Sequence, residues 1–222
     1  MRTRGFTLIE LLIAIAMMAL LAILSWRGLD GMVRARTLTE ARADEVLTLQ
    51  VGLSQWTADL DAIVQTPQLS AIDWNGQVLR LTRRSTQSAN EGVLVVAWTR
   101  RGLEGNGQWL RWQSAGITSR GDLQEAWQQA GQWAQNPGDA ERRREVAITP
   151  LQDWQVFYYR ADAWTNPLSS DASTAAGSTP TAAVSAVIPD GVRVVLQLPQ
   201  GQALAGKITR DWVRPTVSGG KS

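Results

Sequence analysis

Residues 6–24 read FTLIELLIAIAMMALLAIL, and Glu10 is the only charged side chain among these nineteen residues. A helix of about 20 apolar residues crosses a hydrocarbon core of about 30 Å, so this run is long enough to span a membrane. A carboxylate at bilayer depth costs about 3 kcal/mol, so Glu10 requires a partner that compensates its charge. The side chains predicted to face the membrane are Phe6, Leu8, Ile9, Leu11, Leu12, Ile13, Ile15, Leu20, Leu21, Ile23 and Leu24.

Two simpler interpretations of this segment leave features unexplained. A secretory signal peptide has an apolar region of about 7–15 residues that ends in an A-x-A-like cleavage site, whereas this run is longer and no such site follows it. A plain membrane anchor accounts for the length but for neither Glu10 nor the junction between Gly5 and Phe6.

The stretch RGFTLIE at residues 4–10 resembles the prepilin N-terminus shared by type IV pilins and type II secretion pseudopilins. The resemblance implies that residues 1–5 are a leader peptide, which a prepilin peptidase removes by cleavage between Gly5 and Phe6. It also implies N-methylation of Phe6 and an assembly role for Glu10, whose carboxylate would meet the terminal amine of a neighbouring subunit. Glycine has no Cβ, which suits a position where a peptidase approaches the backbone closely.

The charge balance argues against a nucleic-acid partner. The 22 basic and 20 acidic residues give a formal charge of +2, and Arg2 and Arg4 in the leader account for all of it. A polyanion-binding protein would instead gather Lys and Arg on one face. By the positive-inside rule, the two leader arginines favour a cytoplasmic N-terminus.

The chain contains no cysteine and no histidine. These absences remove a disulfide framework, Cys- or His-based catalysis and most zinc sites. Asp171 and Asp190 fall in or near predicted loops but lack the D-x-D-x-D-G spacing of a calcium loop. We therefore predict no enzymatic activity, no catalytic residue, no cofactor and no metal site.

The helical pattern continues past the membrane segment to about Val64, because no proline occurs before Pro67. Residues 25–66 are predicted to be the periplasmic half of this helix. Asp59 and Asp61, two apart, do not share a helix face, so we interpret them as solvated charges rather than an acid–base pair. An apolar stripe with steps of three and four residues is predicted to pack on a sheet; it comprises Val46, Leu49, Leu53, Trp56, Leu60 and Ile63.

Beyond Pro67 the pattern changes: alternation with a period of two, as in residues 77–83, is typical of half-buried strands. Residues 93–99 (VLVVAWT) form a short continuous apolar run, which is consistent with a central strand. A hairpin through residues 102–107 can join two of these strands. A helix with Asp122 as a candidate N-cap is predicted over 122–134, where a strand or loop also fits. The predicted strands cover residues 77–83, 93–99, 109–113, 155–160, 192–198 and 207–213.

The fold class predicted from this order is α+β. The long N-terminal helix, transmembrane in its first half (6–24), packs on an antiparallel β-sheet within a β-rich domain of residues 67–214. Residues 166–186 are rich in Ser, Thr, Ala and Gly and are predicted to form a flexible loop. The tail at 215–222 is expected to fray.

The chain has eleven tryptophans but only two phenylalanines and two tyrosines. Trp56 lies on the apolar stripe and is expected in the core. Trp109 and Trp112 fall on opposite faces of a predicted strand, so we expect one to be exposed or covered by a partner, as an interface anchor. Arg142, Arg143 and Arg144 stand among acidic residues, which indicates a mixed-charge turn rather than a phosphate site.

A second resemblance rests on five segments, at residues 26–30, 47–60, 154–164, 188–194 and 209–212. They resemble the J-type minor pseudopilin of the type II secretion system, which has a pilin-like fold. The resemblance implies an inner-membrane, single-pass protein whose globular domain lies in the periplasm. It implies I-type and K-type minor pseudopilins and the major pseudopilin as partners, in a pseudopilus tip complex that initiates assembly and helps to export folded proteins. A minor pilin of a type IV pilus or competence machine, and a membrane-anchored periplasmic binding or enzymatic domain, remain alternatives.

Overall fold

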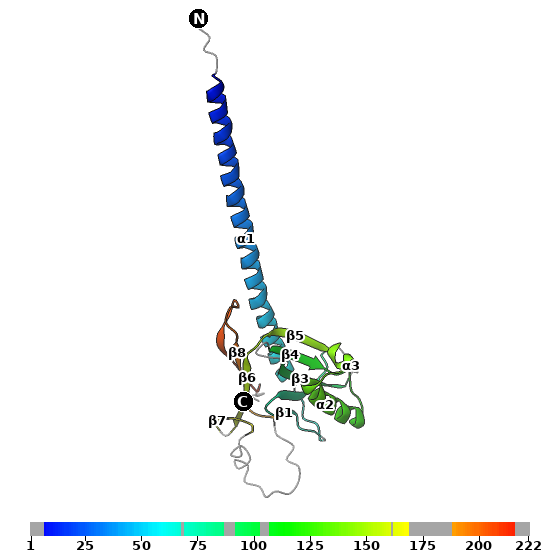
Figure 1. The fold of residues 1–222 in the computed structure, drawn as a ribbon. Helices are drawn as coiled ribbons and strands as arrows, with labels where there is room; N and C mark the ends of the chain where they lie inside the picture. Colours follow the sequence, from blue (N-terminus) through cyan, green and yellow to red (C-terminus); the bar gives the residue numbers. More distant parts are fainter. Residues whose placement is uncertain are drawn as a thin grey trace, which may run out of the picture. The chain divides into compact units, whose positions relative to one another are not determined.

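The computed structural model describes residues 7–67, 69–86, 92–102, 107–160, 162–168 and 188–215. The leader and Phe6, most of the loop predicted at 166–186, and the tail from residue 216 lie outside the described residues. The chain divides into two compact units, residues 1–44 and 45–222. The element order, one long helix followed by antiparallel strands with further helices between them, confirms the α+β class (Figure 1).

Helix α1 (Leu8–Asp61) is the only element of the first unit among the described residues, and it continues into the second. It ends three residues before the predicted Val64. The chain leaves the helix there because the next residues pair with a strand: Val64 N donates to Thr82 O at 2.9 Å, and Arg84 N donates to Ala62 O at 2.9 Å.

The second unit contains two antiparallel sheets rather than the single sheet expected. The five-stranded sheet has the order β1-β2-β3-β4-β5, and the four-stranded sheet has the order β7-β6-β8-β9. All six predicted strands are confirmed, with ends that shift by one or two residues. The strands are β1 (Ile72–Trp74), β2 (Val78–Arg84), β3 (Val93–Arg101), β4 (Gln108–Gln113), β5 (Glu145–Pro150), β6 (Asp153–Arg160), β7 (Ala163–Thr165), β8 (Gly191–Leu198) and β9 (Gly206–Val213).

Helix α2 (Arg120–Gln135) occupies the place of the predicted 122–134 helix but begins two residues earlier. Its N-cap is Ser119, not Asp122: the Ser119 hydroxyl accepts a hydrogen bond from the Asp122 backbone N–H at 3.2 Å. Asp122 lies in the first turn, where its charge suits the helix dipole. A short helix, α3 (Asp139–Arg142), replaces part of the turn predicted around the three arginines.

Two hydrophobic cores lie on opposite faces of the five-stranded sheet. One core joins α1 and both sheets around Trp56, Trp98 and Trp109, whereas the other lies between the five-stranded sheet and α2. Trp109 and Trp112 do point to opposite faces, yet both are buried. The expectation that one of them is exposed is wrong, because α2 covers Trp112, whose ring stacks on Trp133.

The predicted apolar stripe of α1 lies along the first core. Leu49, Trp56 and Leu60 are buried, Leu53 and Ile63 are partly buried against the same core, and Val46 is half-buried. Ile63 reaches this core from beyond the helix end, where it forms a β-bridge with Arg83. The second half of α1 is thus the central element of its unit.

Candidate functional site

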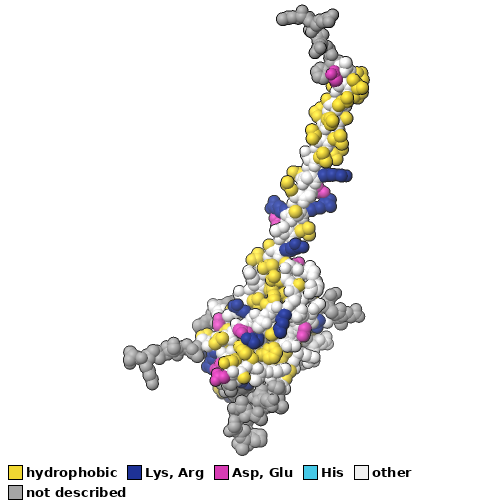
Figure 2. All heavy atoms as spheres, turned by 90° about the vertical axis from the view of Figure 1, so that its left-hand side faces the viewer, with side chains coloured by type: hydrophobic (Ala, Val, Ile, Leu, Met, Phe, Trp, Pro, Cys, Tyr) yellow, Lys and Arg dark blue, Asp and Glu magenta, His cyan; other side chains and the backbone are white. Residues whose placement is uncertain are grey.

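The first unit presents an apolar surface that no other described residue covers. Every large apolar side chain from Leu8 to Leu24 is at least 51% exposed. Figure 2 shows this hydrophobic surface as a continuous band, with Lys and Arg side chains appearing only further along α1. By length and composition, α1 is the one helix among the described residues that could cross a membrane.

Glu10 lies in the first turn of α1, where backbone N–H groups lack helical partners. Its Oε2 accepts hydrogen bonds from the Thr7 N–H at 3.0 Å and from the Thr7 hydroxyl at 2.8 Å. The other oxygen, Oε1, has no hydrogen-bond partner among the described residues. One carboxylate oxygen therefore accepts hydrogen bonds within its own chain, and the other can accept a hydrogen bond from another chain. Gly5 and Phe6 lie outside the described residues.

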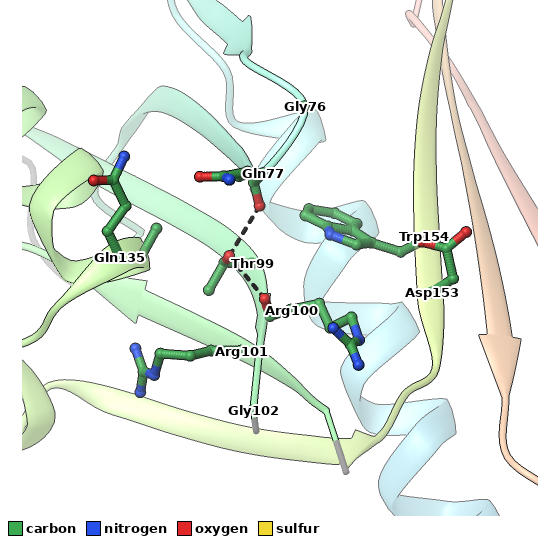
Figure 3. Close-up of a pocket in the computed structure, with 10 residues that line it drawn as sticks. Gly76, Gln77, Thr99, Arg100, Arg101, Gly102, Gln135, Asp153 and Trp154 are labelled. Atoms are coloured by element: carbon green, nitrogen blue, oxygen red, sulfur yellow. Dashed lines mark hydrogen bonds between the residues drawn. The ribbon is translucent and has the colours of Figure 1, made fainter. Parts of the chain in front are cut away.

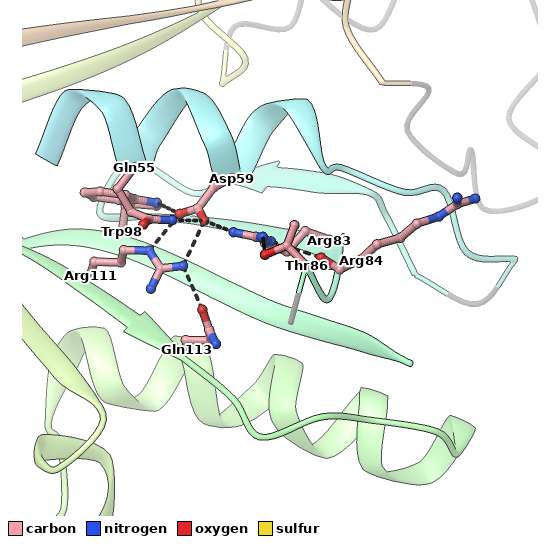
Figure 4. Close-up of polar contacts among 8 residues, drawn as sticks. All are labelled: Gln55, Asp59, Arg83, Arg84, Thr86, Trp98, Arg111 and Gln113. Carbon is pink, nitrogen blue, oxygen red and sulfur yellow. Dashed lines mark hydrogen bonds and ion pairs between the residues drawn. The ribbon is translucent and has the colours of Figure 1, made fainter. Parts of the chain in front are cut away.

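Asp59, interpreted above as a solvated charge, is completely buried, so that interpretation is wrong. Its Oδ1 accepts from Arg83 Nη1 at 2.6 Å and from Arg111 Nη2 at 2.8 Å, and its Oδ2 accepts from Arg111 Nε at 2.8 Å. Trp98 Nε1 and Gln55 Nε2 complete the set of donors at 3.0 and 2.9 Å (Figure 4). Strands β2, β3 and β4 thus each supply a donor to one carboxylate of α1.

The sequence does contain a signal for this cluster. Arg83 follows Leu81 by two residues and Arg111 follows Trp109 by two, so both arginines occupy core-facing positions of their strands. A charged residue at such a position needs a buried partner of opposite sign. Asp59, three residues after Trp56, falls on the same side of α1 as the apolar stripe.

Asp61 contacts the other sheet. Its Oδ1 accepts a hydrogen bond from Trp212 Nε1 at 2.8 Å, while its side chain stays exposed. The two acids therefore bind different sheets, as expected of helix neighbours two residues apart, and do not form a dyad. Together they fix α1 between the sheets.

A polar cleft of about 600 Å³ opens between the two sheets. Its polar groups already serve the fold: the Thr99 hydroxyl donates to Gln77 O at 2.9 Å, Arg100 Nε donates to Leu151 O at 2.9 Å, and Arg101 pairs with Glu145. Figure 3 shows these side chains spread along the walls rather than converging on one point. Within the described ranges, no three His, Cys, Asp or Glu side chains are grouped to hold a metal.

The face of α1 that points away from both sheets carries a second exposed apolar stripe. Leu47 and Val51 are 56% and 68% exposed, and Ser54 and Ala58 continue the stripe with spacings of four, three and four residues. They line a shallow groove of about 440 Å³ together with Gln50 and Gln55, and no charged side chain of the described residues lines it. Apolar and small residues at this spacing are typical of the seam between two packed helices.

Comparisons with known proteins agree with the N-terminal features. Residues 1–26 match the family described as the prokaryotic N-terminal methylation motif. Over 63 residues, the chain is 38% identical to the type II secretion system protein J of Klebsiella pneumoniae; this alignment covers 28% of the chain and about a third (32%) of the relative. A chain in the crystal structure of the GspK–GspI–GspJ complex of the enterotoxigenic Escherichia coli type 2 secretion system aligns with 78% of this chain and 99% of its own length, at a TM-score of 0.46 and 18% identity.

Proposed function

We propose that this chain is a J-type minor pseudopilin of a type II secretion system. Residues 6–24 anchor it in the inner membrane, and its globular domain lies in the periplasm. There it joins I-type and K-type minor pseudopilins and the major pseudopilin in a tip complex that initiates pseudopilus assembly and helps folded proteins to leave the cell. The observation that carries this proposal is a methylation motif at residues 1–26 on the same chain as an exposed apolar helix with one acid.

The chain acts as a structural subunit rather than as an enzyme. Its sequence lacks the histidine and cysteine that most nucleophilic and zinc-dependent mechanisms use. The buried Asp59 is neutralised by two guanidinium groups, and the polar residues of the cleft are engaged in structural hydrogen bonds. These contacts support a rigid domain that presents surfaces to other subunits.

Glu10 has two successive partners in this proposal. In the isolated subunit, the N–H and hydroxyl of Thr7 stabilise one carboxylate oxygen at the helix start. In the assembled pseudopilus, the methylated amine of Phe6 from a neighbouring subunit binds the carboxylate. A buried carboxylate is tolerated when a cation and hydrogen bonds satisfy it, and is strongly unfavourable otherwise, so the pair selects subunits in the correct axial position.

The outward stripe of α1 extends the same assembly surface into the second unit. Leu47, Val51, Ser54 and Ala58 offer a helix from a partner subunit an uncharged surface whose C-terminal half, Ser54 and Ala58, has small side chains. Close approach of two helices requires such small residues at the contact. A minor pilin of a type IV pilus shares the N-terminal motif, but the identity with protein J over 63 residues favours the secretion system.

Mass spectrometry of the chain isolated from a membrane that contains the prepilin peptidase tests the proposal. The expected product comprises residues 6–222 with one added methyl group on Phe6. A Gly5→Val variant serves as the control, because its Cβ and methyl groups hinder the peptidase and should leave the leader attached. An intact Met1 in the parent chain, or cleavage near residue 20, would contradict the proposal.

A further inference from the structure

The two sheets have four edge strands, and three of these are protected against pairing with another chain. β1 and β7 contain three residues each. β5 ends in Pro150 and is interrupted by a β-bulge opposite Trp109 and Leu110. Short strands, proline and bulges are the usual means by which proteins prevent strand addition at a sheet edge.

β9 lacks these three protections, and the protection that it does carry is charge, from Lys207, Arg210 and Asp211. Its eight residues pair with β8 in an unbroken register from Gly206 to Val213 and contain neither a proline nor a bulge. Arg214 N donates to Asp190 O at 2.8 Å, so these two residues form a hydrogen-bonded pair. Hydrogen-bonded and non-hydrogen-bonded pairs alternate along an antiparallel ladder, so this bond determines which residues of β9 bond to β8. The main-chain groups of Gly206, Ile208, Arg210 and Trp212 therefore face β8.

The intervening residues of β9 direct their N–H and C=O groups away from the sheet; they are Lys207, Thr209, Asp211 and Val213. Among the described residues, these outward groups have no backbone hydrogen-bond partner. Both faces are open at the middle of the strand, because Thr209, Arg210 and Asp211 are all exposed. An incoming strand thus meets a row of free donors and acceptors.

The edge is held in place before any partner arrives. At one end, Ala203 N in the β8–β9 turn donates to Glu45 Oε2 at 2.8 Å, and at the other end Trp212 donates to Asp61. Both anchors are on α1, so the helix and β9 run in the same direction over this length. A pre-ordered strand loses little entropy on binding, which favours association.

The charges around this edge identify the chemistry of its partner. On β9 and its paired residue Arg193, three basic side chains and one acidic one give a net charge of +2; they are Arg193, Lys207, Arg210 and Asp211. Asp211 is already engaged, because Arg193 donates to its two oxygens at 2.6 and 2.7 Å. That pairing holds the pKa of Asp211 below its usual value. Lys207, Arg210 and Arg214 make no ion pair within the described ranges.

We propose that β9 is a docking edge for an extended acidic segment of another pseudopilus subunit, which adds to the four-stranded sheet as a fifth strand. This proposal rests on the function proposed above. Main-chain hydrogen bonds supply the affinity, and acidic side chains opposite Lys207 and Arg210 supply the selectivity. A second copy of this chain is a poorer occupant, because antiparallel pairing of two β9 strands would orient their α1 helices in opposite directions.

The test replaces Thr209 at the centre of the edge. In Thr209→Pro the outward N–H is lost, while the hydrogen bonds to β8 are kept, because Thr209 does not contribute to them. Proline is tolerated on an edge strand when its nitrogen faces solvent. Thr209→Val is the matched control, since it keeps the N–H and a β-branched side chain. Equal thermal unfolding midpoints of the two variants establish that both are folded.

Each variant of the full-length chain is produced together with I-type and K-type minor pseudopilins and purified in detergent. We expect the parent and Thr209→Val to retain the partners and Thr209→Pro to retain about tenfold less. In the parent, the amides of Lys207, Thr209, Asp211 and Val213 should exchange hydrogen more slowly in the complex than in the isolated chain. Lys207→Glu should weaken retention several-fold if the added strand is acidic.

The outcomes separate this proposal from the one on which it rests. If Thr209→Pro binds the partners as well as Thr209→Val does, or if the four amides exchange equally fast in the complex, docking at β9 is wrong and the pseudopilin function stands. If Lys207→Glu retains the partners as well as the parent chain does, the proposal that the added strand is acidic is wrong. If the parent chain itself retains neither partner, the proposed function fails, and docking at β9 fails with it.

Discussion

Asp59 places one carboxylate between two guanidinium groups at a position with no solvent exposure. Burying a charge costs several kcal/mol, and a well-hydrogen-bonded pair offsets that cost without necessarily exceeding it. The cluster therefore defines where α1 sits on the five-stranded sheet more than it adds net stability. Removing only the carboxylate leaves Arg83 and Arg111 buried without a counter-charge.

We predict that Asp59→Asn lowers the free energy of unfolding by about 3–5 kcal/mol, the typical cost of leaving a buried charge unpaired. Asp61→Asn is the matched control on the same helix. It keeps an oxygen that accepts from Trp212 and should cost at most about 1 kcal/mol. Denaturant unfolding, followed by tryptophan fluorescence, gives the free energy of unfolding of both variants. If both variants lose a similarly small free energy of unfolding, Arg83 and Arg111 find other partners and the prediction is wrong.

Glu10 is the second residue whose charge decides its role. Glu10→Gln keeps the size of the side chain and an oxygen that accepts from Thr7, but it removes the negative charge that a neighbouring amine would bind. We predict unchanged membrane insertion and impaired pseudopilus assembly. Membrane fractionation and a secretion assay measure the two steps separately. Normal secretion by the variant would exclude charge pairing at Glu10.

The difference between these two residues shows what residue patterns can predict. Glu10 is conspicuous because its neighbours in the sequence are all apolar. Asp59 has ordinary neighbours, and its partners lie 24 and 52 residues away on two different strands. Local periodicity places Asp59, Arg83 and Arg111 on core-facing sides of their elements, but it carries no information about which strands meet the helix, so their pairing follows from the tertiary arrangement.

At the level of elements, the strands with a clear period of two were predictable, whereas β1, β5 and β7 were not. Three residues are too few to establish a period in β1 and β7. In β5 the exposed Val146 and Ala147 are adjacent and the bulge follows them at Ile148, so the strand shows no regular alternation. The number of sheets was also unpredictable, because the pairing partners of a strand are not encoded in its own pattern.

α1 approaches β5 so closely at Gly52 that a Cβ built there would lie 2.3 Å from Ile148 Cγ2. This methyl group is attached to a β-branched carbon and cannot move away by a simple rotation. We predict that Gly52→Ala destabilises the domain by about 1–3 kcal/mol despite the better helix propensity of alanine. Gly31→Ala, with nothing within 4 Å, should strengthen α1. Denaturant unfolding measures the stability of Gly52→Ala, and far-ultraviolet circular dichroism measures the helix content of Gly31→Ala.

The outward stripe of α1 gives a second prediction at this level. Val51→Asp places a charge in the centre of the uncharged groove without disturbing any buried residue, because Val51 is 68% exposed. We expect an unchanged unfolding midpoint and about tenfold weaker co-purification with the I-type and K-type partners, since the carboxylate would be desolvated in the helix contact. Val146→Asp on β5, at a 55% exposed position, is the control. Equal retention by both variants would remove the stripe from the interface.

For the whole molecule, every buried side chain among the described residues lies at or after Leu49. The second compact unit begins at Glu45, which also holds the β8–β9 turn. The first unit adds an apolar surface that no other described residue covers, and in the function proposed above lipid and other subunits cover it. The contacts that stabilise the fold are therefore made by the part of α1 that follows residue 45.

This division predicts that a fragment of residues 45–222 folds without the membrane segment, whereas a fragment of residues 62–222 does not. The longer fragment keeps both cores, Asp59 with its arginines, and ten of the eleven tryptophans. The shorter one exposes Trp98 and Trp109 and leaves Arg83 and Arg111 in an apolar surrounding without a carboxylate. Cooperative denaturant unfolding, followed by tryptophan fluorescence, should appear only for the longer fragment. A cooperative transition in the shorter fragment would mean that the two sheets form a core of their own and that α1 is not its central element.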